Sequence, residues 1–440
     1  MRKNEQNRAF FQFTQVNMTK IELFFYNLVK KNPRLKRRIR DVYQRLFDFF
    51  PIKRTESAYP IKIREGYFFG FHDKCPWSPD NQMLLAHKFN LPLRMPKPDD
   101  VIEVGYFSGP DYQNFKSVGN TKAWNWHQGA QLQWAGSNII FNDFDSEKHI
   151  AKIVDSNAKL LKKTPLPVAA VSPDGDKALS YNFARLRFSP HGYGYANGRD
   201  PEENNLIPQK DGLHLIDIPS GKTILLFSVA DIAKIRPEST MNGAFHYFTH
   251  CQFSPSCKRF VFFHRWMQNK NQQWTRMISC DLEGKDIFIF PTHDMVSHVA
   301  WQDDKNILAY ARTKEYGDKY YLFQDKKEEF QIVGQDCFSS DGHPQFSKDK
   351  RFFVTDTYPD RFRIRYLVVY DLENKKRYNI AKLHSPRKFV GKKFEDILMC
   401  DLHPRWDREG KMVCFDSAHT GKRSLCTIFL DNLDKIKTVD

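Results

Sequence analysis

The stretch Thr249-His250-Cys251-Gln252-Phe253-Ser254-Pro255 is followed closely by Arg259-Phe260-Val261-Phe262-Phe263-His264-Arg265-Trp266. β-Branched and aromatic residues favour strands, and the Ser-Pro-Ser-Cys segment between the two runs favours a tight turn, so the stretch predicts a β-hairpin. Versions of this hairpin recur along the chain. Each copy is built around one apolar residue: Trp77, Trp134, Val171, Phe253, Trp301, Phe346 and Trp406.

Most copies lead into a further strand pair with an acidic turn, such as Leu213-His214-Leu215-Ile216-Asp217. A four-stranded unit repeated about every 40 to 50 residues is typical of a β-propeller blade. We therefore predict an all-β fold, a seven-bladed β-propeller (residues 58–440) with an N-terminal α-helical extension (residues 1–57). The long interval before Phe253 is interpreted as a loop insertion around Gly194 to Asn205, with a degenerate blade between residues 182 and 250 as the alternative.

The last blade has only three strands of its own, ending at Leu425-Cys426-Thr427-Ile428-Phe429-Leu430. Tyr67-Phe68-Phe69-Gly70-Phe71 reads as a strand before the first blade. We expect this early strand to supply the fourth strand of the last blade, because such a pairing closes the ring and removes its edges.

The composition of the chain limits the class of fold and the kinds of partner that can be expected. The chain has 440 residues and is 41% hydrophobic, which is enough for a large core. Its net charge of +16 favours anionic partners such as an acidic polysaccharide or an anionic lipid surface. Nucleic acid is not expected, because there is no zinc finger, RNA-recognition signature or glycine-rich phosphate loop.

Eight cysteines are present without a C-x-x-C pair, and neither a secretory signal nor a run of 18 apolar residues is seen. These features predict a reducing, cytoplasmic location, with a peripheral position at the membrane as an option. The option comes from residues 17–50, where apolar residues at helical spacing flank a basic run, Lys30 to Arg40. Such a helix suits an anionic membrane surface, and it equally suits packing on the side of the propeller.

The sharpest pattern lies three residues before the central apolar residue of each hairpin. Four successive blades carry a histidine there: His250, His298, His343 and His403. The first blade has Lys74 and the second has Gln131. The first strand of a propeller blade lines the central channel, so equivalent positions form a ring at one height. One histidine alone would commonly bond to its own strand, but four in one register predict a shared site.

The return strand of each hairpin ends on the same face as these histidines, which brings Asn142, His264 and Arg265 to that face. The segment from Trp124 to Trp134 adds His127, Gln128 and Gln131. Its aromatic faces suit sugar rings and its amides suit hydroxyl groups, although core packing explains the tryptophans equally well. Arg187 and the glycine-flanked Tyr193 belong to the long insertion, which either covers the site or forms a surface loop.

Four segments resemble the β-propeller polysaccharide lyases, namely the oligogalacturonate-lyase-like and ulvan-lyase-like families. They are Phe71-His72-Asp73-Lys74-Cys75-Pro76-Trp77-Ser78-Pro79, Gln128-Gly129 to Gln133-Trp134, Thr249 to Pro255, and His403-Pro404-Arg405-Trp406 with Asp416-Ser417. The resemblance implies cleavage of a uronate-containing polysaccharide by β-elimination. Such enzymes neutralise the sugar carboxylate, abstract the C5 proton and protonate the leaving oxygen.

In the oligogalacturonate branch a catalytic histidine precedes a Phe-Ser-Pro turn, as His250 does here, and a histidine cluster holds a divalent metal. For this chemistry we predict Arg265 as the partner of the carboxylate, with Arg187 as a weaker candidate, and Tyr193 as the acid, while the resemblance itself implies His250 as the base. It implies a divalent metal, zinc or manganese, on His298, His343 and His403, completed by Cys75 or Asp401.

The chain departs from these families in two respects. Asp401-Leu402-His403 keeps only part of the metal pattern of the oligogalacturonate branch, and those lyases are normally exported whereas no signal is seen here. The alternative function is a non-catalytic propeller that binds or scaffolds surface polysaccharide assembly, such as a bacterial capsule, at the cytoplasmic membrane face.

Overall fold

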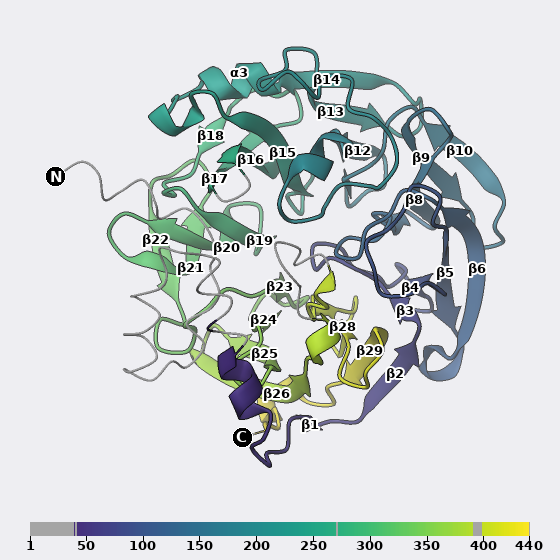
Figure 1. Cartoon of the computed structure of the whole chain (residues 1–440), viewed down its shortest axis with the longest axis vertical. Helices are drawn as coiled ribbons and strands as arrows, with labels where there is room; N and C mark the ends of the chain where they lie inside the picture. Colours follow the sequence, from purple (N-terminus) through teal and green to yellow (C-terminus); the bar gives the residue numbers. More distant parts are fainter. Residues whose placement is uncertain (1–38, 40–41, 270–271, 390–397, 440) are drawn as a thin grey trace.

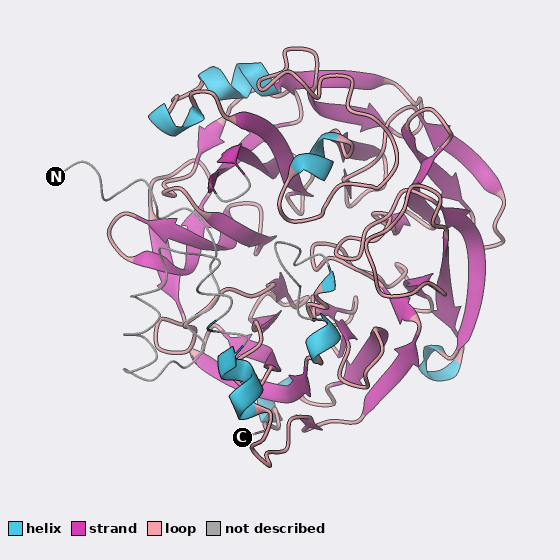
Figure 2. Ribbon diagram, viewed as in Figure 1, coloured by secondary structure: helices cyan, strands magenta, loops and turns pink. Residues whose placement is uncertain are grey.

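The computed structural model describes residue 39 and residues 42–269, 272–389 and 398–439. In these residues seven antiparallel sheets stand around a central axis as the blades of a β-propeller (Figure 1), and almost all regular structure is strand (Figure 2). The predicted all-β, seven-bladed fold is confirmed.

The seven blades follow the chain in order. Blade 1 contains β3 (Tyr67–Phe68), β4 (Leu84–Lys88), β5 (Ile102–Ser108) and β6 (Asn114–Thr121). Blade 2 contains β7 (Gln133–Ala135), β8 (Asn138–Phe144), β9 (His149–Val154) and β10 (Leu160–Thr164). Blade 3 contains β11 (Ala170–Val171), β12 (Lys177–Ser180), β13 (Gly212–Asp217) and β14 (Thr223–Ser228). Blade 4 contains β15 (Phe245–Phe253), β16 (Arg259–Asn269), β17 (Gln272–Asp281) and β18 (Phe288–Ile289).

Blade 5 contains β19 (Val296–Trp301), β20 (Asn306–Thr313), β21 (Gly317–Gln324) and β22 (Phe330–Val333). Blade 6 contains β23 (Gln345–Phe346), β24 (Phe352–Asp356), β25 (Ile364–Asp371) and β26 (Lys376–His384), with β1 (Glu56–Ser57) as a fifth strand. Blade 7 contains β27 (Arg405–Trp406), β28 (Met412–Ser417), β29 (Ser424–Phe429) and β2 (Ile61–Glu65). The inner strands contact one another around the axis, and the largest apolar cluster lies between blades 3 and 4.

Helices are few and short. Besides the helical residues 42–47, the helices in the described part of the chain are α3 (Val229–Lys234) and the 3-10 turns η1 (Pro110–Tyr112), η2 (Arg185–Phe188), η3 (Ser239–Met241), η4 (Arg387–Phe389) and η6 (Leu433–Lys435). The segment between β12 and β13 contains η2 but no strand. The long interval before Phe253 is therefore a loop insertion, as expected, and not a degenerate blade.

The ring is closed by an early strand, but not by the one predicted. Strand β2 pairs with β29 of blade 7, with Ile61 opposite Ile428. The predicted closing segment begins instead with β3, which pairs with β4 inside blade 1. The two short strands are separate because Gly66, at a φ of 83°, turns the chain between them.

The described end of the N-terminal extension lies against blade 6. Residues 42–47 are helical and sit beside β25 and β26 in Figure 1. The rings of Phe47 and Phe362 are 5.0 Å apart, and Asp48 pairs with Arg363. Most of residues 17–50 lies outside the described residues, so the helical extension and its membrane contact remain predictions. In the part that the structure describes, no helix is long and apolar enough to cross a bilayer.

A β-bulge recurs at one position of the inner strand. In blade 4, Thr249 pairs with Phe263 and Gln252 pairs with Val261, so His250 and Cys251 together oppose a single residue. Backbone bonding shows the same two-against-one arrangement at Gln131 in blade 2 and at His403 in blade 7. The residue three positions before the central apolar residue has a positive φ in each of these blades: 53° at Gln131, 58° at His250 and 43° at His403.

A positive φ costs a residue other than glycine about 1–3 kcal/mol, so it persists only where the surroundings enforce it. Blade 5 has its bulge between Val296 and Val299, which includes His298. The recurring bulge therefore changes the direction of the side chains at the repeated position of these blades.

Candidate functional site

The four histidines of the repeated position surround the aromatic ring of Phe71 and form with it what we call the histidine cluster. They are His250, His298, His343 and His403. The ring centroid of Phe71 is 5.1 Å from that of His250, 5.8 Å from His298, 6.3 Å from His343 and 5.0 Å from His403. All five side chains are buried. The predicted convergence of the histidines is therefore present in the structure, with an aromatic residue at its centre.

Phe71 is held there by an ion pair from blade 7. The two carboxylate oxygens of Asp416 accept the backbone N–H groups of Phe69 and Gly70 at 3.0 and 2.9 Å. Arg405 pairs with Asp416 and donates to the carbonyl oxygens of Gly70 and Phe71 at 2.6 and 3.1 Å. Gly70 has a φ of 113°, which a side chain would strain. The Arg405–Asp416 pair thus fixes the backbone that points Phe71 into the ring.

Three of the predicted metal ligands lie together. One candidate ligand atom from each of His343, Asp401 and His403 lies within 4.8 Å of the other two. Two imidazoles and one carboxylate form a donor set that suits zinc or manganese. Burial alone would raise the pKa of Asp401, but the charges of Arg365 and His343 lower it to about 2, so this carboxylate is ionised.

The next layer of groups also suits a metal site. Oδ1 of Asp356 lies 2.6 Å from Nδ1 of His343, which leaves Nε2 of that imidazole as the atom for a ligand. A carboxylate on the far nitrogen is the usual partner of a metal-binding histidine. The residues present therefore fit a divalent cation.

The other two predicted metal ligands, His298 and Cys75, differ in their position relative to this group. His298 lies beside the group, with its ring 4.1 Å from that of His343 and its Nδ1 3.1 Å from Oδ1 of Asp341. Cys75 is not part of the group. Its thiol lies 3.5 Å from the carbonyl oxygen of Trp406, and burial raises its pKa, which disfavours the thiolate that a metal would need.

The three residues predicted to act on the substrate meet on the other side of the cluster. The rings of His250 and Tyr193 are 5.2 Å apart in an edge-on arrangement. The guanidinium carbon of Arg265 lies 5.5 Å from the ring centroid of Phe263, and the Phe263 ring stacks on that of His250 at 4.9 Å, so Arg265 belongs to the same group of side chains. Nδ1 of His250 is 2.8 Å from the hydroxyl oxygen of Thr249, whereas its Nε2 has no hydrogen-bond partner in the described residues.

Burial sets the protonation states of these groups. It lowers the pKa of His250 well below 6.5, with the charge of Arg265 as the next cause, so the imidazole is neutral. It raises the pKa of Tyr193 to about 12, so the phenol keeps its proton. Arg265 is itself only 3% exposed, and its Nε and Nη1 have no hydrogen-bond partner among the described residues.

Of the predicted substrate-binding residues of the segment 124–134, His127 contacts the cluster, whereas Gln128 and Gln131 bond to each other. Nδ1 of His127 lies 3.8 Å from Oδ2 of Asp401, and its ring is 6.0 Å from that of Tyr193. Nε2 of Gln131 donates to Oε1 of Gln128 at 3.1 Å, and both side chains are buried.

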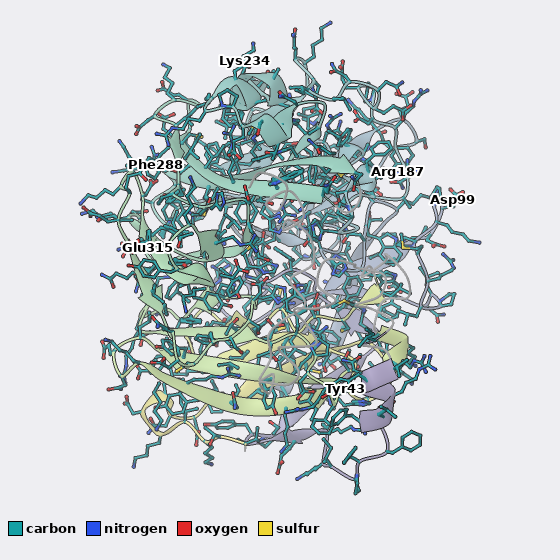
Figure 3. All side chains as sticks on the ribbon, turned by 60° about the vertical axis from the view of Figure 1, so that its left-hand side comes forward. Tyr43, Asp99, Arg187, Lys234, Phe288 and Glu315 are labelled. Carbon is teal, nitrogen blue, oxygen red and sulfur yellow. The ribbon has the colours of Figure 1, made fainter. Side chains whose placement is uncertain are left out.

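Asn142, His264 and Arg187 are placed differently. Asn142 is buried and bonds to the main chain of Val168 and to the Tyr195 hydroxyl. Both ring nitrogens of His264 have protein partners, since Nε2 lies 2.9 Å from Nδ1 of His246 and Nδ1 accepts from Arg276 at 3.0 Å. Arg187 is exposed at the periphery (Figure 3). The structure therefore does not bring these three into the cluster.

His72 also belongs to the histidine cluster, although it does not lie three residues before the central apolar residue of its hairpin. Its ring lies 5.4 Å from the rings of both His298 and His343. Its Nδ1 lies 2.9 Å from the carbonyl oxygen of Pro344, and its Nε2 is without a hydrogen-bond partner in the part of the chain described. Lys74, which does lie three residues before Trp77, instead pairs with Asp73 at 2.7 Å.

Gln273 of blade 4 holds the insertion loop against that blade. Gln273 accepts a hydrogen bond from the Tyr247 hydroxyl at 2.5 Å, and its Nε2 lies 3.0 Å from Nε2 of His191. The ring of His191 stacks on that of Tyr193 at 5.4 Å. Hence the insertion loop does cover the cluster, and Tyr193 is its innermost contact there.

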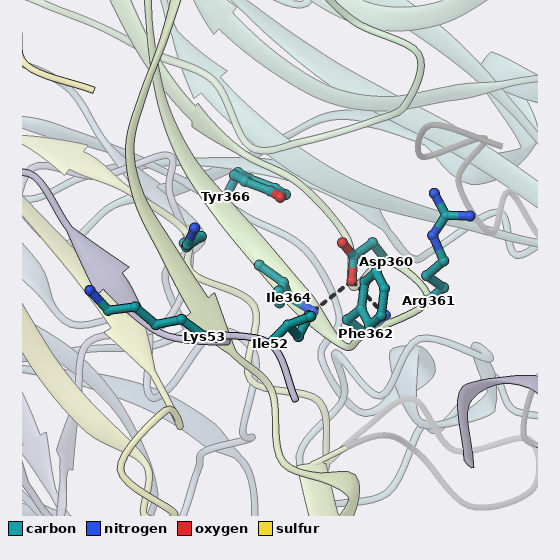
Figure 4. A pocket seen from close by; sticks show the side chains of 8 residues that line it. Ile52, Lys53, Asp360, Arg361, Phe362, Ile364 and Tyr366 are labelled. Carbon is teal, nitrogen blue, oxygen red and sulfur yellow. Dashed lines mark hydrogen bonds between the residues drawn. The ribbon is translucent and has the colours of Figure 1, made fainter. Parts of the chain in front are cut away.

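A pocket of about 300 Å³ lies away from this cluster, where residues 52–53 approach β25 and β26 (Figure 4). Its lining includes Lys53, Arg361 and Lys382 together with Phe362 and Tyr366. Lys53 and Lys382 both pair with Glu56, so part of this charge is neutralised within the protein.

No family model matches the chain, and no curated protein matches it. The solved structures that resemble it include an oligogalacturonate lyase in complex with manganese and an oligogalacturonate lyase from Vibrio parahaemolyticus. Each is 12% identical with a TM-score of 0.58 and covers 87% of this chain, which corresponds to 96% and 97% of the respective lyase. At this identity the likeness shows the propeller fold alone.

Proposed function

We propose that this chain binds an acidic, uronate-containing oligosaccharide or polysaccharide at the histidine cluster and cleaves it by β-elimination. The observation that carries the proposal is the buried guanidinium of Arg265, whose Nε and Nη1 have no hydrogen-bond partner within the described residues. It lies near His250, whose Nε2 also lacks a partner there and whose ring contacts that of Tyr193. A buried cation without an anionic partner is costly, and a sugar carboxylate would supply that partner.

The chemistry divides among these three side chains. Arg265 holds the carboxylate and thereby favours removal of the C5 proton. Neutral His250 takes that proton at Nε2 as the C5–H bond breaks. The C4–O bond then breaks, the C4–C5 double bond forms, and Tyr193 gives its proton to the departing oxygen.

His343, Asp401 and His403 would hold a divalent cation, which supplies Lewis-acid polarisation of a bound carboxylate. His298 lies next to this group and would complete it. The fold likeness to lyases, one of them described in complex with manganese, supports this assignment.

The decisive experiment is an assay for unsaturated uronate by absorbance of the conjugated product. Purified protein is incubated with manganese or zinc and with a panel of acidic polysaccharides and oligosaccharides. His250→Ala is expected to lower the rate by about 100- to 10,000-fold, as expected on loss of a positioned base. His214→Ala, a histidine of β13 outside the cluster, is the matched control and should leave the rate unchanged.

Two outcomes would overturn the assignment. If no acidic polymer yields the unsaturated product with the metal-loaded protein, the lyase proposal is wrong. Binding without turnover would then favour a non-catalytic role in surface polysaccharide assembly. If His250→Ala retains full activity, the lyase function stands but His250 is not the base.

A further inference from the structure

Arg365 on β25 presents a second buried guanidinium at the cluster. The side chain is 1% exposed, and its Nη1 lies 2.7 Å from Oδ1 of Asp401. Its Nε and Nη2 have no hydrogen-bond partner in the described residues. These two nitrogens share one edge of the guanidinium, the edge that binds a carboxylate through two parallel hydrogen bonds.

Empty donors at this depth call for an explanation. Leaving one buried polar group unpaired costs about 1–3 kcal/mol, and more when the group is charged. The pairing with Asp401 uses only Nη1 and leaves the two-donor edge unfilled. A ligand oxyanion is the group that such an edge fits.

The position of Arg365 relative to Arg265 indicates which part of a ligand it would meet. Arg265 comes from blade 4 and lies beside His250, whereas Arg365 comes from blade 6 and lies beside Asp401. Asp401 lies 3.8 Å from His127, whose ring is 6.0 Å from that of Tyr193. On its other side Tyr193 packs on His250, which stacks on Phe263 next to Arg265, so the two arginines approach the Tyr193 region from different blades.

We propose that Arg365 binds a second anionic group of the substrate, a carboxylate or a sulfate ester on the sugar next to the one held by Arg265. This inference rests on the proposed function and narrows it, because the preferred substrate then carries an anionic group on each of two successive sugars.

The test compares binding of three probes by calorimetry: glucuronic acid, an unsulfated di-uronate disaccharide, and a uronate disaccharide with a sulfate on its neutral sugar. The full-length protein is expected to bind at least one disaccharide about 10- to 100-fold more tightly than glucuronic acid. Arg365→Lys keeps the charge opposite Asp401 but loses the two-donor edge, so it should remove this preference and leave glucuronic acid binding unchanged. The disaccharide that loses more affinity identifies the anion.

Arg377→Lys, on the neighbouring strand β26 and bonded to the carbonyl of Cys337, is the matched control and should keep the preference. If Arg365→Lys keeps it too, or if the unaltered protein binds all three probes equally, the inference is wrong although the proposed function stands. If no probe binds, the proposed function itself fails. Should the lysine variant not fold, the comparison of the probes on the unaltered protein decides.

Discussion

Asp356 holds both His343 and His403 with a single carboxylate. Its Oδ1 lies 2.6 Å from Nδ1 of His343 and accepts that residue's backbone N–H at 3.0 Å. Its Oδ2 accepts the backbone N–H of His403 at 3.3 Å and that of Leu402 at 3.0 Å. One side chain from the end of β24 thus sets the geometry of two candidate metal ligands from neighbouring blades.

Removing the charge of Asp356 should therefore weaken metal binding. Asp356→Asn is expected to lower the affinity for manganese or zinc by about 10- to 100-fold, the usual cost of losing such a supporting carboxylate. Metal titration by calorimetry measures this. Asp371→Asn, in the same blade but paired with Arg351, is the matched control. Equal affinity in Asp356→Asn and the unaltered protein would contradict the metal assignment or this supporting role.

Gln273 should control the stability of the loop over the cluster. Gln273→Met removes the amide that joins Tyr247 to His191 while keeping a similar volume, so the loop loses a tether. Hydrogen exchange in peptides covering residues 186–199 is expected to speed up. Gln272→Met, whose amide oxygen accepts from Asn269 at the hairpin end, should leave that exchange unchanged. Unchanged exchange in both variants would show that the loop does not depend on Gln273.

Acid should destabilise the fold through its buried histidines. Burial lowers the pKa of His246 to about 4 and that of His87 to about 3, with nearby arginines adding to the effect. Below pH 6.5 the unfolded chain binds protons that the folded chain excludes, so stability is lost as pH falls from 6.5 toward 4 and then 3. Each histidine contributes up to about 1.4 kcal/mol per pH unit.

Urea unfolding at several pH values measures this loss. His246→Asn should flatten the dependence between pH 6.5 and 4 while His87 still contributes. A free energy of unfolding that stays constant across this range would contradict the neutral, buried state of these histidines.

Arg64 should tie the closing strand to both ends of the ring. It donates to the carbonyl oxygens of Tyr112 and Asp111 in blade 1, at 2.8 and 2.5 Å, and to the Thr427 hydroxyl in blade 7 at 3.2 Å. Arg64→Met is expected to cost about 1–3 kcal/mol of unfolding free energy, measured by chemical denaturation. Lys62→Met loses only an exposed ion pair with Asp111 and should cost less than about 1 kcal/mol. Equal effects of the two variants would contradict the bridging role.

The repeat allowed the histidine ring to be predicted because each histidine lies three residues before a buried apolar residue of an inner strand. The count fails in blade 1, where the inner strand is interrupted between Phe68 and Trp77 and only a single bridge joins Trp77 to Leu84. The residue three positions before Trp77 is Lys74, but the residues of blade 1 that lie in the cluster are Phe71 and His72.

Contacts between blades could not be read from the repeat. The pairing of Asp356 with His403, and of Arg365 with Asp401, depends on how adjacent sheets face each other. Asn142 and His264 lie outside the cluster for a related reason, because strand ends on the correct face also carry groups that bond within the protein. The closing strand was misassigned because the short segment Ile61–Glu65, just before Gly66, was not recognised as a strand of its own.

The closure of the ring has a consequence for how the chain is made. Arg64 and Thr427, which bond across β2 and β29, are 363 residues apart in the sequence. During synthesis β2 leaves the ribosome long before its partner exists, so it waits unpaired while blades 1 to 6 form. Contacts this distant are slow to form and leave strand edges open to other chains. Closing the ring therefore joins an early strand to the last one made, and yield in the cell should depend on how long that edge stays protected.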